Sequence, residues 1–238
     1  MHIPAGSFAA LVGPSGGGKS TAGQLLARFW DVDSGSISIG GKDIRDYSTK
    51  ALMNTVAFVF QDTYIFAESV YDNIAMHQNV TQEAVEYAAK AARCHDFIQA
   101  LPEGYHTKLG DGGHKLSGGE AQRIAIARAI LKNAPIVVLD EAMAFTDAEN
   151  ELALREGMAE LLKGKTVLMI AHRLYSIQDA DMIFVLENGR LKESGTHKDL
   201  LQKHGLYAHL WDIQNETESW RMKGGAVHVS DNPAIHLP

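Results

Sequence analysis

Eight residues near the start of the chain combine types and spacing that suit phosphate binding. Gly13 to Ser20 read Gly-Pro-Ser-Gly-Gly-Gly-Lys-Ser, which fits the pattern G-x-x-x-x-G-K-[ST]. The glycines allow the backbone to curl so that successive N–H groups point at phosphate oxygens. Lys19 adds a positive charge for the outer phosphates, and the Ser20 hydroxyl is a suitable ligand for Mg²⁺. A chance match in a glycine-rich turn is the alternative, but it arises in only about one chain in a hundred of this length.

Residues 116–120 form a second motif that contains glycines, Leu-Ser-Gly-Gly-Glu. Ser117 and Glu120 have the spacing of a capping box, so the start of a helix explains these two residues without any ligand. Gly118 and Gly119 fall in the first turn of that helix, where each costs up to roughly 1 kcal/mol relative to alanine. Helix stability does not favour these glycines, whereas close approach of a ligand to bare backbone N–H groups does.

Two neighbouring carboxylates follow an apolar run. Residues 136–139 are Ile-Val-Val-Leu and lead directly into Asp140 and Glu141. Downstream of a phosphate loop, one acid suits a metal ion and the other suits a water molecule. The alternative is a pair of surface acids at the end of a strand, which the presence of the phosphate loop disfavours.

Two other apolar runs end in a polar residue. Gln61 follows residues 56–60, and His172 follows residues 166–171. A lone histidine is more often structural than functional. However, ligands of open α/β sheets bind at the carboxyl ends of the strands, and both residues fall at such an end.

These positions require a mostly parallel sheet. The apolar runs 7–12, 56–60, 136–139 and 166–171 are typical of buried parallel strands. Residues 21–28 carry a helical pattern directly after the phosphate loop, which places the loop at a helix N-terminus. The sequence therefore predicts an α/β fold, a parallel sheet flanked by helices.

The segment from about 69 to 130 lacks strand signals and predicts a helical subdomain inserted between two strands of the sheet. Thr81 is placed to cap a helix that reaches about Ala92. The helix that begins at the Leu-Ser-Gly-Gly-Glu motif continues to about Lys132. No heptad run and no basic cluster occurs between Gln61 and this motif.

The C-terminal part predicts a hairpin, a broken helix and a tail. Residues 182–186 and 190–193 are joined by Asn188-Gly189, a strong hairpin signal. A helix from about Lys198 is interrupted near Gly205. The polar segment 219–238 contains Gly-Gly and prolines and predicts a loose tail after a domain that spans residues 1–218.

Composition excludes several classes of protein. The chain has 238 residues, 45% hydrophobic and 21% charged, which is ordinary for a globular protein. A net charge of −7 gives no support to nucleic acid as a partner. Cys94 is the single cysteine, so an internal disulfide is excluded and a reducing compartment is favoured. No apolar run is long enough to cross a bilayer, so any membrane association is expected through another chain.

The order of the phosphate loop, Gln61, the Leu-Ser-Gly-Gly-Glu motif, Asp140-Glu141 and His172 resembles the ATP-binding domain of ABC transporters. The second motif discriminates, because a phosphate loop alone is shared by many P-loop NTPases. Residues 66–74, 101–105 and 110–113 look like the exporter-type branch. A shorter likeness, in residues 140–151, is to siderophore transporters.

The resemblance implies an ATPase in which ATP and Mg²⁺ lie between two such domains, a homodimer or heterodimer attached to membrane-spanning domains at the cytoplasmic face of the membrane. The residues implied to hold the phosphates are Gly13, Pro14, Ser15, Gly16, Gly17, Gly18, Lys19, Ser20 and Thr21. Ser20, Gln61 and Asp140 are implied at Mg²⁺, Glu141 as general base and His172 at the γ-phosphate. Ser117, Gly118 and Gly119 are implied to cover the γ-phosphate held by the opposite subunit.

Two departures from the family pattern affect these expectations. The family has an aromatic residue on a strand before the phosphate loop that stacks on adenine, and residues 1–12 contain no such strand. We therefore expect weak discrimination between ATP and GTP. The family segment Thr-Ser-Ala-Leu-Asp after Glu141 is replaced by residues 143–147, where Ala144 takes the place of a hydroxyl that reaches across the dimer.

Two other functions remain open from the sequence. The first is a soluble ABC-type ATPase of DNA repair or chromosome maintenance, which carries a long coiled coil or DNA-binding segment before the Leu-Ser-Gly-Gly-Glu motif. The second is a catalytically weak nucleotide-binding module, favoured by the two departures. ATP turnover, measured alone and with a membrane partner, discriminates the second from a transporter ATPase.

Overall fold

The structure, a computed structural model, describes residues 1–60, 62–140 and 148–222. Its centre is a six-stranded sheet in the order β4-β5-β6-β1-β7-β8. The strands are β1 (Phe8–Val12), β4 (Val56–Val59), β5 (Ile136–Asp140), β6 (Thr166–Ile170), β7 (Met182–Glu187) and β8 (Arg190–Gly195). All neighbours are parallel except β7 and β8, which form the expected antiparallel hairpin. The prediction of an α/β fold with a mostly parallel sheet is confirmed.

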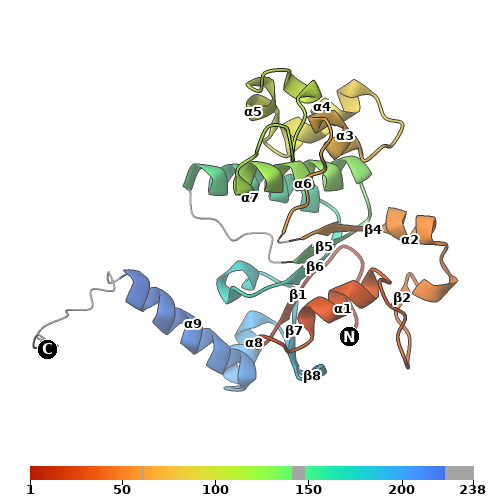
Figure 1. The fold of residues 1–238 in the computed structure, drawn as a ribbon. Helices are drawn as coiled ribbons and strands as arrows, with labels where there is room; N and C mark the ends of the chain where they lie inside the picture. Colours follow the sequence, from red (N-terminus) through yellow and green to blue (C-terminus); the bar gives the residue numbers. More distant parts are fainter. Residues whose placement is uncertain (61, 141–147, 223–238) are drawn as a thin grey trace, which may run out of the picture.

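Helices cover both faces of this sheet (Figure 1). One face carries α1 (Lys19–Leu26), α2 (Thr49–Thr55) and a small sheet of β2 (Ser38–Ile39) and β3 (Lys42–Asp43). The other face carries α6 (Gly118–Lys132), α7 (Ala148–Leu162), α8 (His197–Gln202) and α9 (Leu206–Met222). Alternate residues of a strand point to opposite faces, as β1 shows: Ala9 and Leu11 pack toward α1, and Ala10 and Val12 pack toward the second face.

A helical layer lies above α6, at the top of Figure 1. It consists of α3 (Val70–Ala75), α4 (Gln82–Ala91) and α5 (His95–Gln99), which fall between β4 and α6 in the sequence. Thr81 accepts a hydrogen bond from the Ala84 N–H and caps α4, as its position predicts. Among the described residues this segment is made of short helices joined by turns, and it holds no coiled coil of the kind that a DNA-repair ATPase would insert.

The register of the sheet brings the carboxyl ends of four strands to one edge. Val59 pairs with Leu139, Leu139 with Met169, and Met169 with Ala10. The chain therefore leaves β4, β5, β6 and β1 at nearly the same level. This edge is where the expected functional residues follow their strands.

The C-terminal part agrees with the sequence in two features and differs in one. Asn188 and Gly189 both have positive φ, 50° and 72°, as a tight hairpin turn requires. The helix is interrupted between α8 and α9, at residues 203–205, and the predicted interruption near Gly205 falls there. However, α9 continues to Met222, four residues into the predicted loose tail, because residues 219–222 contain no glycine or proline to end a helix. No helix in the described ranges is both long and apolar enough to cross a bilayer.

Candidate nucleotide-binding site

The predicted phosphate loop joins the carboxyl end of β1 to the N-terminus of α1. Gly18 is the N-cap of α1, has a left-handed φ of 96°, and offers no side-chain cap. The first N–H groups of a helix have no partner within the helix, and the helix dipole makes this end positive. The loop therefore presents hydrogen-bond donors and a partial positive charge to an anion.

Two glycines of this loop, Gly13 and Gly17, are required by its contact with the β7–β8 hairpin. A Cβ atom on Gly13 would lie 1.9 Å from the carbonyl oxygen of Leu186, and one on Gly17 would lie 3.0 Å from the same oxygen. The Gly189 N–H also donates a hydrogen bond of 3.0 Å to the Gly17 carbonyl. The sequence did not predict this packing, because Asn188-Gly189 indicates a hairpin turn but not that the turn contacts the phosphate loop.

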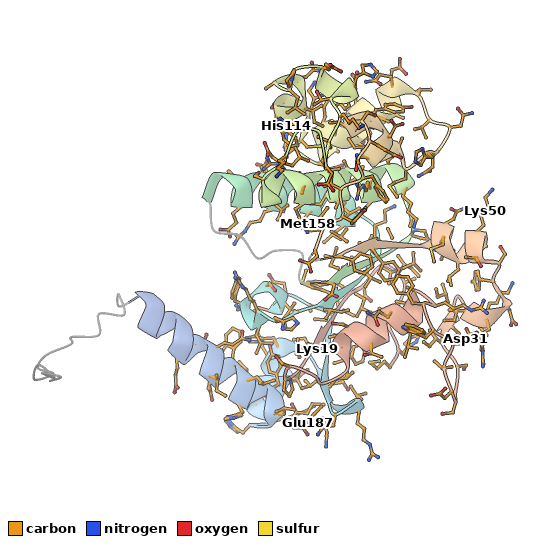
Figure 2. The ribbon with its side chains drawn as sticks, viewed as in Figure 1. Lys19, Asp31, Lys50, His114, Met158 and Glu187 are labelled. Carbon is orange, nitrogen blue, oxygen red and sulfur yellow. The ribbon has the colours of Figure 1, made fainter. Side chains whose placement is uncertain are left out.

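Lys19 lies over the loop that precedes it. The residue is only 3% exposed, and its ammonium group donates hydrogen bonds to the carbonyl oxygens of Gly13 (2.9 Å) and Pro14 (3.0 Å). Figure 2 shows Lys19 at the start of α1, beside the end of β1. Ser20 and Thr21 follow in the first turn, and both are exposed. The predicted phosphate ligands thus lie on one loop and in the first turn of α1, together with the positive charge of Lys19.

The sheet edge adds residues from neighbouring strands. Asp140, at the end of β5, pairs with Ile170 of β6, and Ile170 pairs with Leu11 of β1. The Ala171 N–H donates to the Leu11 carbonyl (3.0 Å), so His172 follows immediately beside the strand that enters the phosphate loop. Gln61 and Glu141 follow β4 and β5 at the same edge in sequence, but both lie outside the described residues.

The donor set at this edge fits a magnesium ion that arrives with a nucleotide. In the described ranges, no three His, Cys, Asp or Glu side chains gather as a site held by the protein alone would require. Mg²⁺ in nucleotide sites takes only one or two protein ligands and completes its shell with phosphate oxygens and water. The exposed Ser20 hydroxyl and the Asp140 carboxyl group supply oxygen ligands of this kind.

The Leu-Ser-Gly-Gly-Glu motif begins α6 with a complete capping box. The Ser117 side chain accepts from the Glu120 N–H (3.3 Å), and the Glu120 carboxylate accepts from the Ser117 N–H (2.8 Å). The cap explains Ser117 and Glu120 but leaves Gly118 unexplained. A Cβ atom on Gly118 would meet nothing within 4 Å, and its φ is not among the positive ones. Among the residues that the structure describes, none requires a glycine at this exposed position for steric reasons.

The two motifs lie in different parts of the molecule. Figure 2 shows His114, three residues before Ser117, in the upper part of the view above α6, whereas Lys19 lies in the lower part, at the start of α1.

Thr63 and Tyr64, which follow Gln61, are hydrogen-bonded to α6. The Thr63 hydroxyl donates to the Gln122 side chain (3.1 Å), and the Arg128 guanidinium donates to the Tyr64 carbonyl (2.7 Å). Burial lowers the pKa of Arg128 to about 10, so its side chain remains charged at neutral pH. This connection between residues 63–64 and α6 depends on contacts that no spacing in the sequence indicates.

Arg128 also binds a fully buried asparagine. Asn73 accepts from Arg128 (2.7 Å) and from the Phe66 N–H (2.9 Å), and it donates to the carbonyls of Phe66 and Ser69 (3.0 Å each). One side chain thus joins α3, α6 and the segment that precedes α3.

Residues 1–144 match the family described as ABC transporter. A multidrug export ATP-binding/permease protein of Bacillus subtilis is 49% identical over 216 residues, which cover 90% of this chain and 37% of that protein. A protein of the same description from Staphylococcus aureus is 48% identical over 216 residues, which again cover 90% of this chain and 37% of that protein. The chain therefore spans less than two fifths of the length of these relatives.

A solved structure agrees with the sequence relatives. The structure of a bacterial Atm1-family ABC exporter with ATP bound matches with a TM-score of 0.83 and 42% identity. The match covers 97% of this chain and 39% of that chain. The comparisons thus support the exporter-type likeness that residues 66–74, 101–105 and 110–113 carry.

Proposed function

The chain belongs to the ABC transporter family, as an ATP-binding domain of the exporter type, and we propose that it hydrolyses ATP in a site shared between two subunits. The observation that carries this proposal is the exposed Gly118 at the start of α6, with open space where a side chain would be. A second molecule that approaches this helix end from outside accounts for the missing side chain. The phosphate loop of another subunit, with its bound ATP, is the proposed occupant.

The residues take the roles that the motif order implies. Gly13 to Thr21 hold the phosphates, with the N–H groups of the α1 N-terminus and the Lys19 ammonium group facing the negative charge. Ser20, Gln61 and Asp140 serve Mg²⁺, which neutralises charge on the phosphate oxygens when it is bound. Ser117, Gly118 and Gly119 of the opposite subunit complete the pocket.

The proposed reaction is attack of water on the γ-phosphorus of ATP, which breaks its bond to the β–γ bridging oxygen and releases ADP and inorganic phosphate. Glu141 takes a proton from this water, and His172 contacts the γ-phosphate oxygens. Because residues of both subunits surround each ATP, neither subunit completes a site alone. Hydrolysis is therefore proposed to depend on dimer formation.

The membrane-spanning partners are proposed from the relatives. Those proteins are ATP-binding/permease proteins, and this chain matches 37% of their length. We propose that the chain works at the cytoplasmic face of the membrane, attached to membrane-spanning domains of the same transporter, as one half of a homodimer or heterodimer.

Glu141→Gln tests the proposal. The variant keeps the shape of the pocket and removes the base, so we expect ATP to bind normally while hydrolysis falls by about 10²–10⁴-fold. Light scattering should detect an ATP-dependent dimer of this variant. Glu151→Gln is the control and should keep normal turnover, because Glu151 is half exposed and pairs with Arg155 (2.6 Å). Unchanged turnover of Glu141→Gln, or a monomer at saturating ATP, would contradict the proposal.

A further inference from the structure

The main chain around His172 is held from two sides. On one side the Ala171 N–H donates to the Leu11 carbonyl of β1 (3.0 Å), two residues before the phosphate loop. On the other side, Gln214 of α9 donates from its side-chain amide to the His172 carbonyl (2.6 Å) and accepts from the Leu174 N–H (2.8 Å). The segment that carries His172 is therefore fixed between the strand that enters the phosphate loop and a helix near the C-terminus.

Gln214 satisfies a backbone group that the local sequence leaves without a cap. Leu174 begins a short 3₁₀ helix, η3 (Leu174–Ile177), whose N-cap residue Arg173 makes no side-chain cap bond. The first N–H groups of a helix need an acceptor from elsewhere, and Gln214 provides it. Because one end of its amide group accepts and the other donates, rotation of the amide would break both bonds. The side chain is thus matched to this segment of the main chain.

The N-terminal end of α9, the helix that carries Gln214, is held against the sheet. The Leu206 and Tyr207 N–H groups donate to the Glu193 carboxylate of β8 (2.6 and 3.1 Å), and Tyr207 is fully buried. Gln214 follows eight residues after Leu206, about 12 Å farther along the helix. The hydrogen bonds to Glu193 therefore fix α9 against the sheet, and Gln214 connects α9 to the main chain of residues 172 and 174.

We propose that Gln214 is a positioning residue for His172. Its two hydrogen bonds hold the main chain of residues 172 and 174, and thereby hold His172 in the position from which it contacts the γ-phosphate. This inference rests on the proposed function. Gln214 acts through the main chain of residues 172 and 174, and it does not itself touch the nucleotide. Its effect is therefore specific for nucleotides that carry a γ-phosphate.

Calorimetry of ATP and ADP binding to the full chain tests the proposal. Gln214→Leu keeps the approximate size of the side chain and removes both bonds, and Gln214→Glu keeps the acceptor but cannot donate to the His172 carbonyl. Since each removes at least one net hydrogen bond, we expect ATP affinity to fall about fivefold. ADP affinity should not change, because ADP lacks the γ-phosphate. The control Asn215→Leu, at the next and exposed position of α9, should bind both nucleotides normally.

A double-mutant cycle with His172→Ala distinguishes positioning from general support of the fold. If Gln214 acts through His172, Gln214→Leu will weaken ATP binding no further in the His172→Ala background. Equal losses of ATP and ADP affinity, additive effects in the cycle, or unchanged binding by both variants would overturn the inference. If Gln214→Leu does not fold, Gln214→Glu gives the same readout with a polar side chain of similar size.

The unaltered chain and His172→Ala separate this inference from the proposed function. Absence of ATP binding by the unaltered chain, or undiminished ATP affinity of His172→Ala, would overturn the proposed function and this inference with it. A selective loss of ATP affinity in His172→Ala together with normal binding by the Gln214 variants would overturn this inference alone.

Discussion

The carbonyl oxygen of Leu186 stands 1.9 Å from the point that a Cβ atom of Gly13 would occupy. This contact joins β7 to the first residue of the phosphate loop. Gly13 also has a φ of 145°, which side chains rarely allow. The glycine that opens the loop is therefore needed for packing inside the protein, whether or not a nucleotide is bound.

Gly13→Ala should destabilise the chain in the absence of any nucleotide. Overpacking costs about 1–3 kcal/mol, and the backbone strain adds to this cost. Gly16→Ala is the control, because Gly16 also has positive φ (74°) but no atom lies within 4 Å of its Cβ position. Denaturant unfolding should show a larger loss of stability for Gly13→Ala. Equal losses for the two variants would mean that the contact with Leu186 does not constrain the loop.

The local parts of the fold and site were predictable from the sequence. The phosphate loop, the Thr81 cap and the Asn188-Gly189 turn depend on residues within a few positions of one another, so their spacing carries the signal. The buried parallel strands were predicted for a similar reason, since each is a continuous apolar run.

Contacts between distant residues were not predictable. Leu186 against Gly13, Thr63 against Gln122 and Gln214 against His172 join positions at least 40 residues apart. Glutamine and threonine occur on most surfaces, so nothing in their type marks them as partners. Only the order of the strands, in which β1 lies between β6 and β7, brings the hairpin turn and the His172 segment to the phosphate loop.

Lys19→Ala should weaken ATP binding itself. The substitution removes the charge that faces the phosphates, and a hydrogen bond to a charged group contributes roughly 1.5–3 kcal/mol, which is about ten- to hundredfold in affinity. Ser20→Ala gives a contrast, because its loss should appear only when Mg²⁺ is present. Calorimetry with Mg²⁺ and with a chelator separates the two effects. Intact ATP affinity of Lys19→Ala would refute the assignment of the phosphate loop.

Asn73→Leu should destabilise the connection between α3 and α6. The variant leaves the Phe66 N–H and one N–H of Arg128 without their acceptor, and each buried polar group left unpaired costs about 1–3 kcal/mol. Asn79→Leu, at an exposed position, should change the free energy of unfolding little. Denaturant unfolding of both variants measures the difference. Equal stability of the two would show that the Asn73 hydrogen bonds contribute nothing net.

His197 makes the stability of the C-terminal helices depend on pH. Its ring Nδ1 lies 2.7 Å from the Tyr207 hydroxyl, and its ring packs edge to face on Trp211 with centroids 4.6 Å apart. Burial lowers the pKa of His197 below its ordinary value of 6.5; Asp179 opposes this shift and Lys198 adds to it. The neutral ring is therefore the form that the folded chain prefers.

His197→Gln should make the chain less sensitive to mild acid. As the pH falls below 6.5, the unfolded chain binds a proton at His197 before the folded chain does, which favours unfolding. The stability that His197 contributes is therefore complete above pH 6.5 and is lost as the pH falls through the lower folded pKa. Denaturant unfolding of the unaltered chain from pH 7.5 to 5 should show a steeper loss than in His197→Gln. His209→Gln, at an exposed position of α9, should keep the steep loss. The same pH dependence in His197→Gln and the unaltered chain would show that this histidine titrates alike in both states.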